Sequence, residues 1–317
     1  MSIAFVFPGQ GSQSTGMLAG LARTEPVVEA TFAEASEVLG YDLWTLCQRG
    51  PDTELALTEK TQPAMLAAGV ATWRALQSHA QLRPAAMAGH SLGEYSALVC
   101  SGALDFRTAV DLVRDRGRLM QQAVPIGEGA MAAVLGLEDA EVESACAEAA
   151  GSEVVEAVNF NAPGQVVIAG HATAVARAIE VAKGRGAKRA VLLPVSVPSH
   201  SSLMRGAAEK LAGKLATIEL RRPLVPDVYT VDVRRHADPE GIRSALKEQL
   251  YKPVRWADTV RAMLASGVTT IVECGPGRVL TSLNRRIARG PGLTMLAVDD
   301  SETLASVLAA TLESPDA

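Results

Sequence analysis

The sequence predicts an α/β protein in which a small βαββαβ unit is inserted into a larger α/β domain. Three observations support this prediction. A short apolar run, Ile3–Phe7, ends in the turn Pro8-Gly9-Gln10-Gly11 and is followed by helical patterns, as expected of a buried strand in an α/β protein. Between residues 126 and 197 the pattern changes to closely spaced strands and helices. The chain has 317 residues, 48% of them hydrophobic and 21% charged, which is enough for a substantial globular core.

Apolar periodicity predicts the elements of the larger domain in chain order. Those before the insert are the strand Ile3–Phe7, helices over Glu25–Leu39 and Gln62–Ser78, a short strand before Ser91, and a helix that starts after Asp105 and runs to about Ala123. The residues before Ser91 are small, but a proline precedes them and a glycine turn follows, which favours a buried strand. Asp105 is a suitable N-cap, because its carboxylate can accept a hydrogen bond from the first helical turn.

The insert is predicted from the order of its elements. They are the strand Gly129–Leu137, the helix Asp139–Ala150, the strands Val154–Phe160 and Gln165–Ala169, the helix Ala172–Gly184 and the strand Lys188–Val197. This is the order of a split βαβ, or ferredoxin-like, unit. We therefore expect an inserted domain over residues 126–197 and a larger domain over residues 1–125 and 198–317. The larger domain includes the strand Thr269–Glu273, the turn Cys274-Gly275-Pro276-Gly277 and a helix after it, and the tail Glu313–Ala317 is expected to fray.

Charge and cysteine usage exclude several classes of function. Lys and Arg number 30 against 35 Asp and Glu, a formal net charge of −5, so no global field attracts nucleic acid or an anionic membrane. The four cysteines form no CxxC or Cys/His cluster, which argues against a zinc site and a disulfide framework. No signal peptide and no apolar run of roughly 18 residues is present. We expect a cytoplasmic protein with no metal, no membrane segment and no nucleic-acid partner.

The segment Gly89-His90-Ser91-Leu92-Gly93 is a G-x-S-x-G sequence between a predicted strand and a predicted helix. In a nucleophile elbow, the flanking glycines permit a sharp turn, and the serine Oγ projects above the sheet. The backbone N–H after the serine, here that of Leu92, contributes to an oxyanion hole at the positive end of the helix. The alternative is an ordinary glycine-rich turn, but the strand-to-helix position favours the nucleophile.

A serine of ordinary pKa needs a base, and the chain offers five histidines. His79 and His236 lie among polar residues and are expected at the surface, and His171 is placed to start a helix. His90 is next to the serine and points elsewhere on a tight turn. His200 follows an apolar run at a strand-to-loop junction, which makes it the best candidate, although a purely structural histidine is the competing interpretation.

Arg116 occupies an unusual place on its predicted helix. On a helical wheel it falls between Leu112 and Met120, in the middle of the apolar stripe. A buried guanidinium without an anion is costly, so it needs a carboxylate or phosphate that it can grip with two hydrogen bonds. Two alternatives follow: a structural ion pair with an Asp or Glu elsewhere in the chain, or a substrate carboxylate.

Eight segments occur in an order typical of one family. They are Phe7-Pro8-Gly9-Gln10-Gly11-Ser12-Gln13, Gly89-His90-Ser91-Leu92-Gly93-Glu94-Tyr95, Arg116-Gly117, Gly129-Ala130-Met131, Asn161-Ala162-Pro163-Gly164-Gln165, Val197-Pro198-Ser199-His200-Ser201-Ser202-Leu203-Met204, Gln249-Leu250 and Gly275-Pro276-Gly277. Together they resemble the malonyl-CoA:acyl carrier protein transacylases of bacterial fatty acid synthesis. The resemblance covers the chain from about residue 3 to about residue 290 and is highly specific as a set.

The resemblance implies a large α/β-hydrolase-like domain with an inserted ferredoxin-like domain. It also implies a role for each site residue. These roles are Ser91 as nucleophile, His200 as its base, the Gln249 backbone carbonyl as the group that orients the histidine, the N–H groups of Gln10 and Leu92 as the oxyanion hole, and Arg116 as the partner of the malonyl carboxylate. The Pro198-Ser199-His200 sequence resembles that of malonyl-selective members.

The implied reaction is transfer of malonyl from malonyl-CoA to the phosphopantetheine thiol of holo acyl carrier protein, through a malonyl-serine ester. No cofactor is implied, since the CoA thioester is a substrate. Three alternatives stay open. One is the malonyl transferase subunit of malonate decarboxylase, which serves a different carrier. Another is a serine esterase or thioesterase, and the third is a catalytically idle scaffold.

Overall fold

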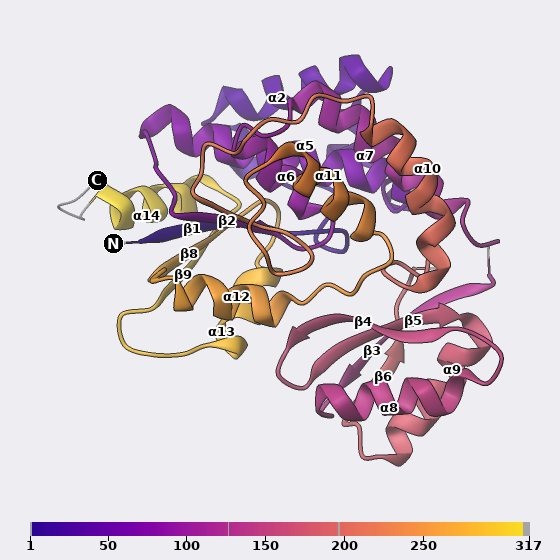
Figure 1. Cartoon of the computed structure of the whole chain (residues 1–317). Helices are drawn as coiled ribbons and strands as arrows, with labels where there is room; N and C mark the ends of the chain where they lie inside the picture. Colours follow the sequence, from indigo (N-terminus) through magenta and orange to yellow (C-terminus); the bar gives the residue numbers. More distant parts are fainter. Residues whose placement is uncertain (1, 126, 196, 313–317) are drawn as a thin grey trace.

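The computed structural model describes residues 2–125, 127–195 and 197–312, and shows a mixed α/β protein with two separate sheets (Figure 1). The five-stranded sheet is parallel throughout. Its strands, in spatial order, are β7 (Asp227–Tyr229), β2 (Ala86–Gly89), β1 (Ile3–Phe7), β8 (Thr270–Cys274) and β9 (Thr294–Val298). The predicted mixed α/β class is therefore confirmed.

The parallel sheet is buried on both faces, and alternate residues of β1 show why. Phe5 and Phe7 pack into a large core with helices α2, α5, α6 and α7, while Ala4 and Val6 pack with α12 and α13 on the opposite face (Figure 1). The helices of this part are α1 (Ala19–Ala22), α2 (Pro26–Leu39), α3 (Leu43–Arg49), α4 (Asp52–Leu55), α5 (Thr58–His79), α6 (Gly93–Cys100), α7 (Phe106–Gln121), α10 (Arg205–Leu215), α11 (Pro239–Glu248), α12 (Trp256–Ala265), α13 (Val279–Ile287) and α14 (Ser301–Leu312).

The second sheet is antiparallel and lies within one continuous stretch of chain. Its elements are β3 (Gly129–Leu135), α8 (Asp139–Ala150), β4 (Val155–Ala162), β5 (Gln165–His171), α9 (Ala172–Gly184) and β6 (Arg189–Leu192), with the strands in the order β4-β5-β3-β6. The predicted βαββαβ order is confirmed, and α8 and α9 cover one face of this sheet (Figure 1). Residue 126, the predicted start of the insert, lies outside the described residues, as does the tail 313–317.

Some predicted boundaries are wrong. Strand β6 ends at Leu192, not at Val197, because Pro194 has no N–H to continue the ladder, and residue 196 lies outside the described part. Helix α5 begins one turn before the predicted Gln62, and α7 ends at Gln121. The Asp105 cap is confirmed, since its carboxylate accepts a hydrogen bond of 2.9 Å from the N–H of Thr108.

Strand β4 lies at the edge of its own sheet and also bonds to the larger part of the chain. The N–H of Val254 donates to the carbonyl of Val158 (2.8 Å), and the N–H of Phe160 donates to the carbonyl of Val254 (2.9 Å). A side-chain bond of 2.8 Å joins Asn161 Oδ1 at the end of β4 to His90 Nε2. The free edge of the small sheet is thus covered by the segment before α12.

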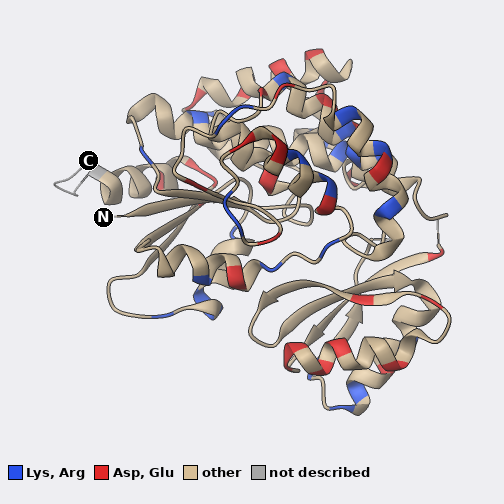
Figure 2. Cartoon of the chain, viewed as in Figure 1, with Lys and Arg blue, Asp and Glu red and all other residues tan. Residues whose placement is uncertain are grey.

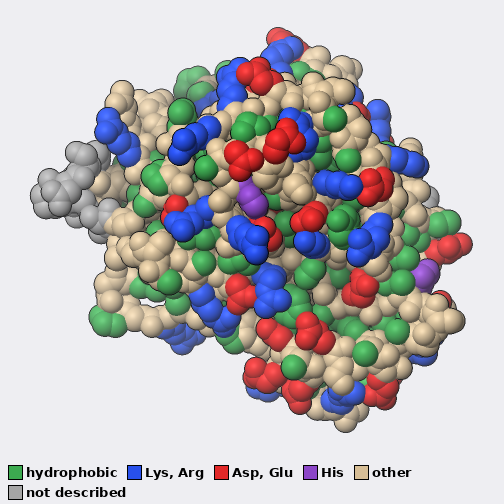
Figure 3. Space-filling view, viewed as in Figure 1, with side chains coloured by type: hydrophobic (Ala, Val, Ile, Leu, Met, Phe, Trp, Pro, Cys, Tyr) green, Lys and Arg blue, Asp and Glu red, His purple; other side chains and the backbone are tan. Residues whose placement is uncertain are grey.

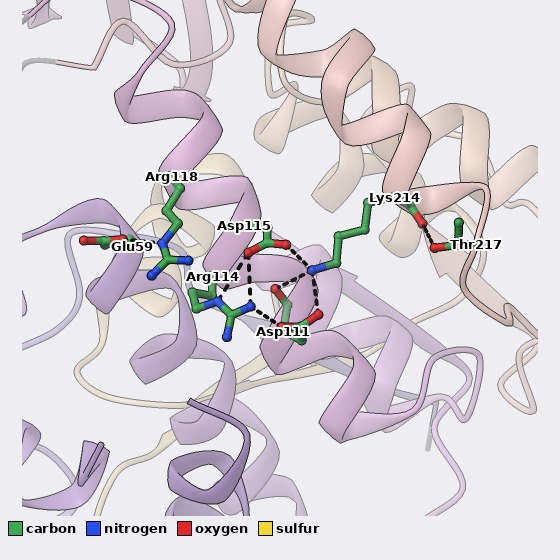
Figure 4. Close-up of polar contacts among 7 residues, drawn as sticks. All are labelled: Glu59, Asp111, Arg114, Asp115, Arg118, Lys214 and Thr217. Atoms are coloured by element: carbon green, nitrogen blue, oxygen red, sulfur yellow. Dashed lines mark hydrogen bonds and ion pairs between the residues drawn. The ribbon is translucent and has the colours of Figure 1, made fainter. Parts of the chain in front are cut away.

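Charged side chains lie mostly on helices and loops, and the outer face of α7 carries several of them (Figure 2). There Arg114 and Lys214 of α10 share the carboxylate of Asp115, and Arg118 pairs with Glu59 of α5 at 2.7 Å (Figure 4). Basic and acidic side chains are interspersed over the face seen in Figure 3, with hydrophobic side chains in small groups between them. Within the described ranges, no helix is long and apolar enough to cross a membrane.

Candidate active site

The segment Gly89–Gly93 forms a sharp turn at the junction of β2 and α6, the backbone geometry that a nucleophile elbow requires. Ser91 has φ 53°, in the left-handed region that a side chain rarely adopts. A Cβ added to Gly89 would lie 1.8 Å from the backbone carbon of Gly93, and one added to Gly93 would lie 2.0 Å from the carbonyl oxygen of Phe7. Both glycines are therefore required by close backbone approach, and the turn that they permit raises Ser91 at the carboxyl end of the parallel sheet.

His200 lies beside this serine, as predicted from the sequence. Its Nε2 is 2.7 Å from Ser91 Oγ, and its Nδ1 is 2.7 Å from the backbone carbonyl of Gln249. A carbonyl can only accept, so Nδ1 carries the proton and Nε2 presents a lone pair to the serine hydroxyl. The backbone of His200 has φ 66° and its N–H donates to the carbonyl of Leu250 (3.0 Å), which fixes the ring between the two loops.

The imidazole of His200 is held in its neutral form. Burial is the main cause, and the nearby positive charge of Arg116 acts in the same direction, so that the pKa of His200 is lowered to about 3. At neutral pH the ring is therefore unprotonated and able to accept the serine proton. This is the protonation state that a general base must have before reaction.

The other four histidines make contacts that keep them from the serine hydroxyl. His90 is bonded to Asn161, and burial lowers its pKa. His171 is the N-cap of α9, and its ring accepts a hydrogen bond from the N–H of Val154. His79 pairs with Glu25 and is about half exposed, as expected. His236 pairs with Asp232, and its side chain is partly exposed.

Arg116 is buried on the inner face of α7, as the wheel predicts, with 1% of its surface exposed. Its Nη1 donates to Gln62 Oε1 (2.9 Å) and its Nη2 donates to Gln249 Oε1 (2.8 Å). Its guanidinium also lies 5.4 Å from the centre of the Tyr95 ring. No salt bridge to Arg116 is found in the described ranges, so the predicted alternative of a structural ion pair is wrong. Its partners are neutral amides.

The side chain of Gln249 connects these groups, which the sequence did not indicate. Its amide nitrogen donates to the carbonyl of Ser91 (2.9 Å) and to Glu94 Oε2 (2.7 Å), while its amide oxygen accepts from Arg116. Burial raises the pKa of Glu94 to about 8, so this carboxyl is mostly uncharged at neutral pH. One signal pointed to Glu94, namely a carboxyl one turn after the nucleophile on a predicted helix. Its burial could not be read from the sequence.

The turn after β1 packs against the elbow. The N–H of His90 donates to the carbonyl of Phe7 (3.0 Å), and a Cβ on Gly9 would lie 2.4 Å from the carbonyl oxygen of His90. This brings the predicted oxyanion-hole residues Gln10 and Leu92 to one edge of the sheet. Among residues that the structure describes, neither of their N–H groups has a hydrogen-bond partner. Across all the residues that the structure describes, no cluster of three or more His, Cys, Asp or Glu side chains could hold a metal ion.

Comparison with known proteins identifies the family. The acyl transferase domain family matches residues 4–303. The malonyl CoA-acyl carrier protein transacylase of Escherichia coli (strain K12) is 56% identical over 305 residues, which cover 96% of this chain and 98% of that protein. The protein of the same name from Bacillus subtilis (strain 168) is 45% identical over 304 residues, 95% of each chain.

Solved structures agree with this result. The crystal structure of an acyl carrier protein S-malonyltransferase from Vibrio cholerae has a TM-score of 0.93 and 56% identity, covering 97% of this chain and 100% of that one. A malonyl-transacylase solved in complex with its type II polyketide acyl carrier protein has a TM-score of 0.95 and 54% identity, covering 98% and 100%. The chain therefore belongs to the acyl transferase domain family, in which these relatives are malonyl-CoA:acyl carrier protein transacylases.

Proposed function

We propose that the protein transfers a malonyl group from malonyl-CoA to the phosphopantetheine thiol of holo acyl carrier protein, and so supplies fatty acid elongation. One observation carries the proposal: Ser91 Oγ, His200 Nε2 and the Gln249 carbonyl form a continuous relay of 2.7 Å bonds. The relatives that are named for this activity support it. The decisive experiment is to incubate the protein with malonyl-CoA and holo carrier protein and to weigh the products.

The reaction divides into two acyl transfers. Ser91 Oγ attacks the thioester carbonyl while His200 Nε2 takes its proton, the carbon–sulfur bond breaks, and CoA leaves as the thiol with that proton. The carrier's thiol then gives its proton to His200 and attacks the carbonyl of the malonyl-serine ester. The ester carbon–oxygen bond breaks, and His200 returns the proton to Ser91 Oγ. The acyl group enters already activated as a thioester, so no cofactor is needed. The backbone carbonyl of Gln249 orients the imidazole without adding the full charge of an aspartate.

The oxyanion that forms in each transfer needs hydrogen-bond donors at the serine. We assign this role to the backbone N–H groups of Leu92, at the start of α6, and of Gln10, after β1. The packing of the β1 turn against the elbow and the positive end of α6 support the assignment. The carboxylate of the malonyl group is assigned to Arg116, the buried cation of the site.

The same proposal extends to architecture and location. We describe residues 1–125 and 198–317 as an α/β-hydrolase-like domain, because a strand-to-helix elbow on a parallel sheet carries the nucleophile. Residues 126–197 are described as a ferredoxin-like insert, since the antiparallel sheet and its helices occupy that stretch. A carrier-dependent transferase of acyl-CoA is expected to act in the cytoplasm.

Two other functions use the same residues. A thioesterase would hydrolyse malonyl-CoA without a carrier, and the malonyl transferase subunit of malonate decarboxylase would prefer a different carrier protein. The relatives favour the transacylase. Release of malonate from malonyl-CoA at the same rate with and without holo carrier would instead establish the thioesterase.

Arg116→Ala is expected to change selectivity between acyl groups. The substrate carboxylate loses its charged partner, at a cost on the order of 3–5 kcal/mol, so malonyl transfer should fall by roughly 10²–10³ or more. Slow acetyl transfer should persist, since acetyl-CoA has no carboxylate. The measurement is the ratio of the two acylation rates, with Arg118→Ala, an exposed arginine of the same helix, as control. Equal loss for both substrates would contradict the assignment.

The acylation rate is expected to be insensitive to acid until well below neutral pH. Only the neutral imidazole of His200 accepts the serine proton, and this form prevails above its pKa of about 3. Activity should therefore stay level between about pH 7 and pH 5, more than one unit above that pKa, and decline only below this range. A stopped-flow pH profile of adduct formation tests this. An acid limb centred between pH 6 and 7 would show an unperturbed histidine.

A further inference from the structure

Of the four arginines of α7, three pair with carboxylates and one, Arg116, bonds to amides. Arg114 and Arg118 lie on the outer face, where Arg114 pairs with Asp115 and Arg118 pairs with Glu59 of α5 (Figure 4). Arg116 lies on the inner face, and there the partner from α5 is Gln62, one turn after Glu59. The arginine that is deepest in the protein, where an unbalanced charge costs most, is thus the one that faces amides instead of carboxylates.

With these partners, the guanidinium of Arg116 has no directly bonded counter-charge among the residues that the structure describes. The two amide oxygens accept hydrogen bonds but carry no net charge. Burial lowers the pKa of Arg116, as expected for a desolvated cation. Glu94 bonds to Gln249 rather than to the guanidinium, and its pKa of about 8 keeps it mostly uncharged. The Nε–H of Arg116 is buried and has no hydrogen-bond partner within the described residues.

Gln62 is itself fully buried, with 1% of its surface exposed, and its other contact is weak. Its amide nitrogen lies 3.5 Å from the sulfur of Met120, a poor acceptor. Among the residues that the structure describes, its one strong side-chain hydrogen bond is the one that it accepts from Arg116. A carboxylate of the same size would satisfy that bond better and would also neutralise the buried cation.

We propose that Gln62 determines acyl-group specificity: its neutral oxygen holds the Arg116 guanidinium in place while leaving the positive charge free for the carboxylate of a dicarboxylic acyl thioester. The inference rests on the proposed function, because it takes malonyl-CoA as the substrate. Gln62 acts through Arg116 and is a positioning residue. A carboxylate here would occupy the charge permanently and repel the incoming substrate carboxylate.

The proposal predicts opposite effects on stability and selectivity for Gln62→Glu. The buried cation gains a counter-charge, so the Tm of the substrate-free protein should rise by roughly 2 °C or more. The ratio of malonyl to acetyl acylation rates should fall by at least about tenfold, since the like charges now oppose binding. Acetyl acylation should stay within a few-fold of wild type, since Ser91 and His200 are unchanged.

Gln62→Leu is the matched control, because it removes the hydrogen bond without adding charge. It should lower the Tm, whereas Gln62→Glu raises it. It should also lower the ratio of malonyl to acetyl rates by less than Gln62→Glu does, because the guanidinium is held less firmly but its charge stays free for the substrate carboxylate. The proposal is overturned if Gln62→Glu keeps the wild-type ratio, if the glutamate and leucine variants lower both rates in parallel, or if Gln62→Glu is less stable than wild type or fails to fold.

Failure of the underlying function shows in a different measurement. If the wild-type protein forms no malonyl adduct and transfers nothing to holo carrier protein, the proposed function fails. If the wild type is active and only the ratio of Gln62→Glu is unaltered, the function stands and the inference fails.

Discussion

Ser91→Ala is expected to abolish the covalent malonyl adduct that intact-mass measurement detects after incubation with malonyl-CoA. The substitution removes the hydroxyl that lies 2.7 Å from His200 Nε2 and is proposed to attack the thioester. Removal of the nucleophile in another serine enzyme lowers turnover by about 10⁶. Transfer to the carrier protein should therefore fall to the uncatalysed background.

The fold should survive this substitution. Alanine, like serine, carries a Cβ, so the left-handed backbone at position 91 is no more strained than before. Ser96→Ala, which removes a buried hydroxyl of α6 outside the catalytic relay, controls for packing. A malonyl mass on an active-site peptide of the Ser91→Ala protein would show that another residue is the nucleophile.

His200→Ala is expected to slow acylation by about 10²–10⁴, the usual loss on removing a general base. The serine hydroxyl then keeps its proton as it attacks, because the imidazole that would accept this proton, and that the Gln249 carbonyl orients, is absent. Single-turnover adduct formation is the measurement, since it isolates the first acyl transfer from the second.

His79→Ala is the matched control, because His79 is about half exposed and pairs with Glu25, away from Ser91. Its acylation rate should equal that of wild type. A near-normal rate in His200→Ala would assign the base to another histidine, first of all His90, the part-buried neighbour of Ser91.

Local patterns were sufficient to predict much of the fold. The βαββαβ order follows from strong alternation and from helices with clear ends, such as α8 and α9, whose predicted bounds match the structure. Strands β7 and β9 were not predicted. β7 has only three residues, Asp227–Tyr229, and its place at the sheet edge depends on pairing with β2, far away in the chain. Such pairing leaves no trace in local periodicity.

The same distinction between local and long-range signals applies to the candidate site. The glycines around Ser91 and the apolar stripe around Arg116 are local signals, and both indicated the residues that the structure brings together. The amide partners of Arg116 are not local: Gln62 and Gln249 lie 54 and 133 residues away in sequence. Only tertiary packing selects them. Of the two alternatives for Arg116, the structural ion pair was wrong because a buried cation indicates that a partner exists, but not that the partner is an acid.

The double attachment of β4 limits how this protein can be recombined with its relatives. Consider a chimera that takes the antiparallel unit, from residue 126 to residue 197, from a relative. The donor strand would have to re-form the backbone hydrogen bonds that Val158 and Phe160 make with Val254. It would also have to re-form the bond from Asn161 to His90. The exchange unit is therefore larger than the insert and includes the segment around Val254. His90 precedes Ser91 in the chain. A donor strand that cannot bond to His90 would therefore disturb the turn at Ser91 even when both parent proteins fold well.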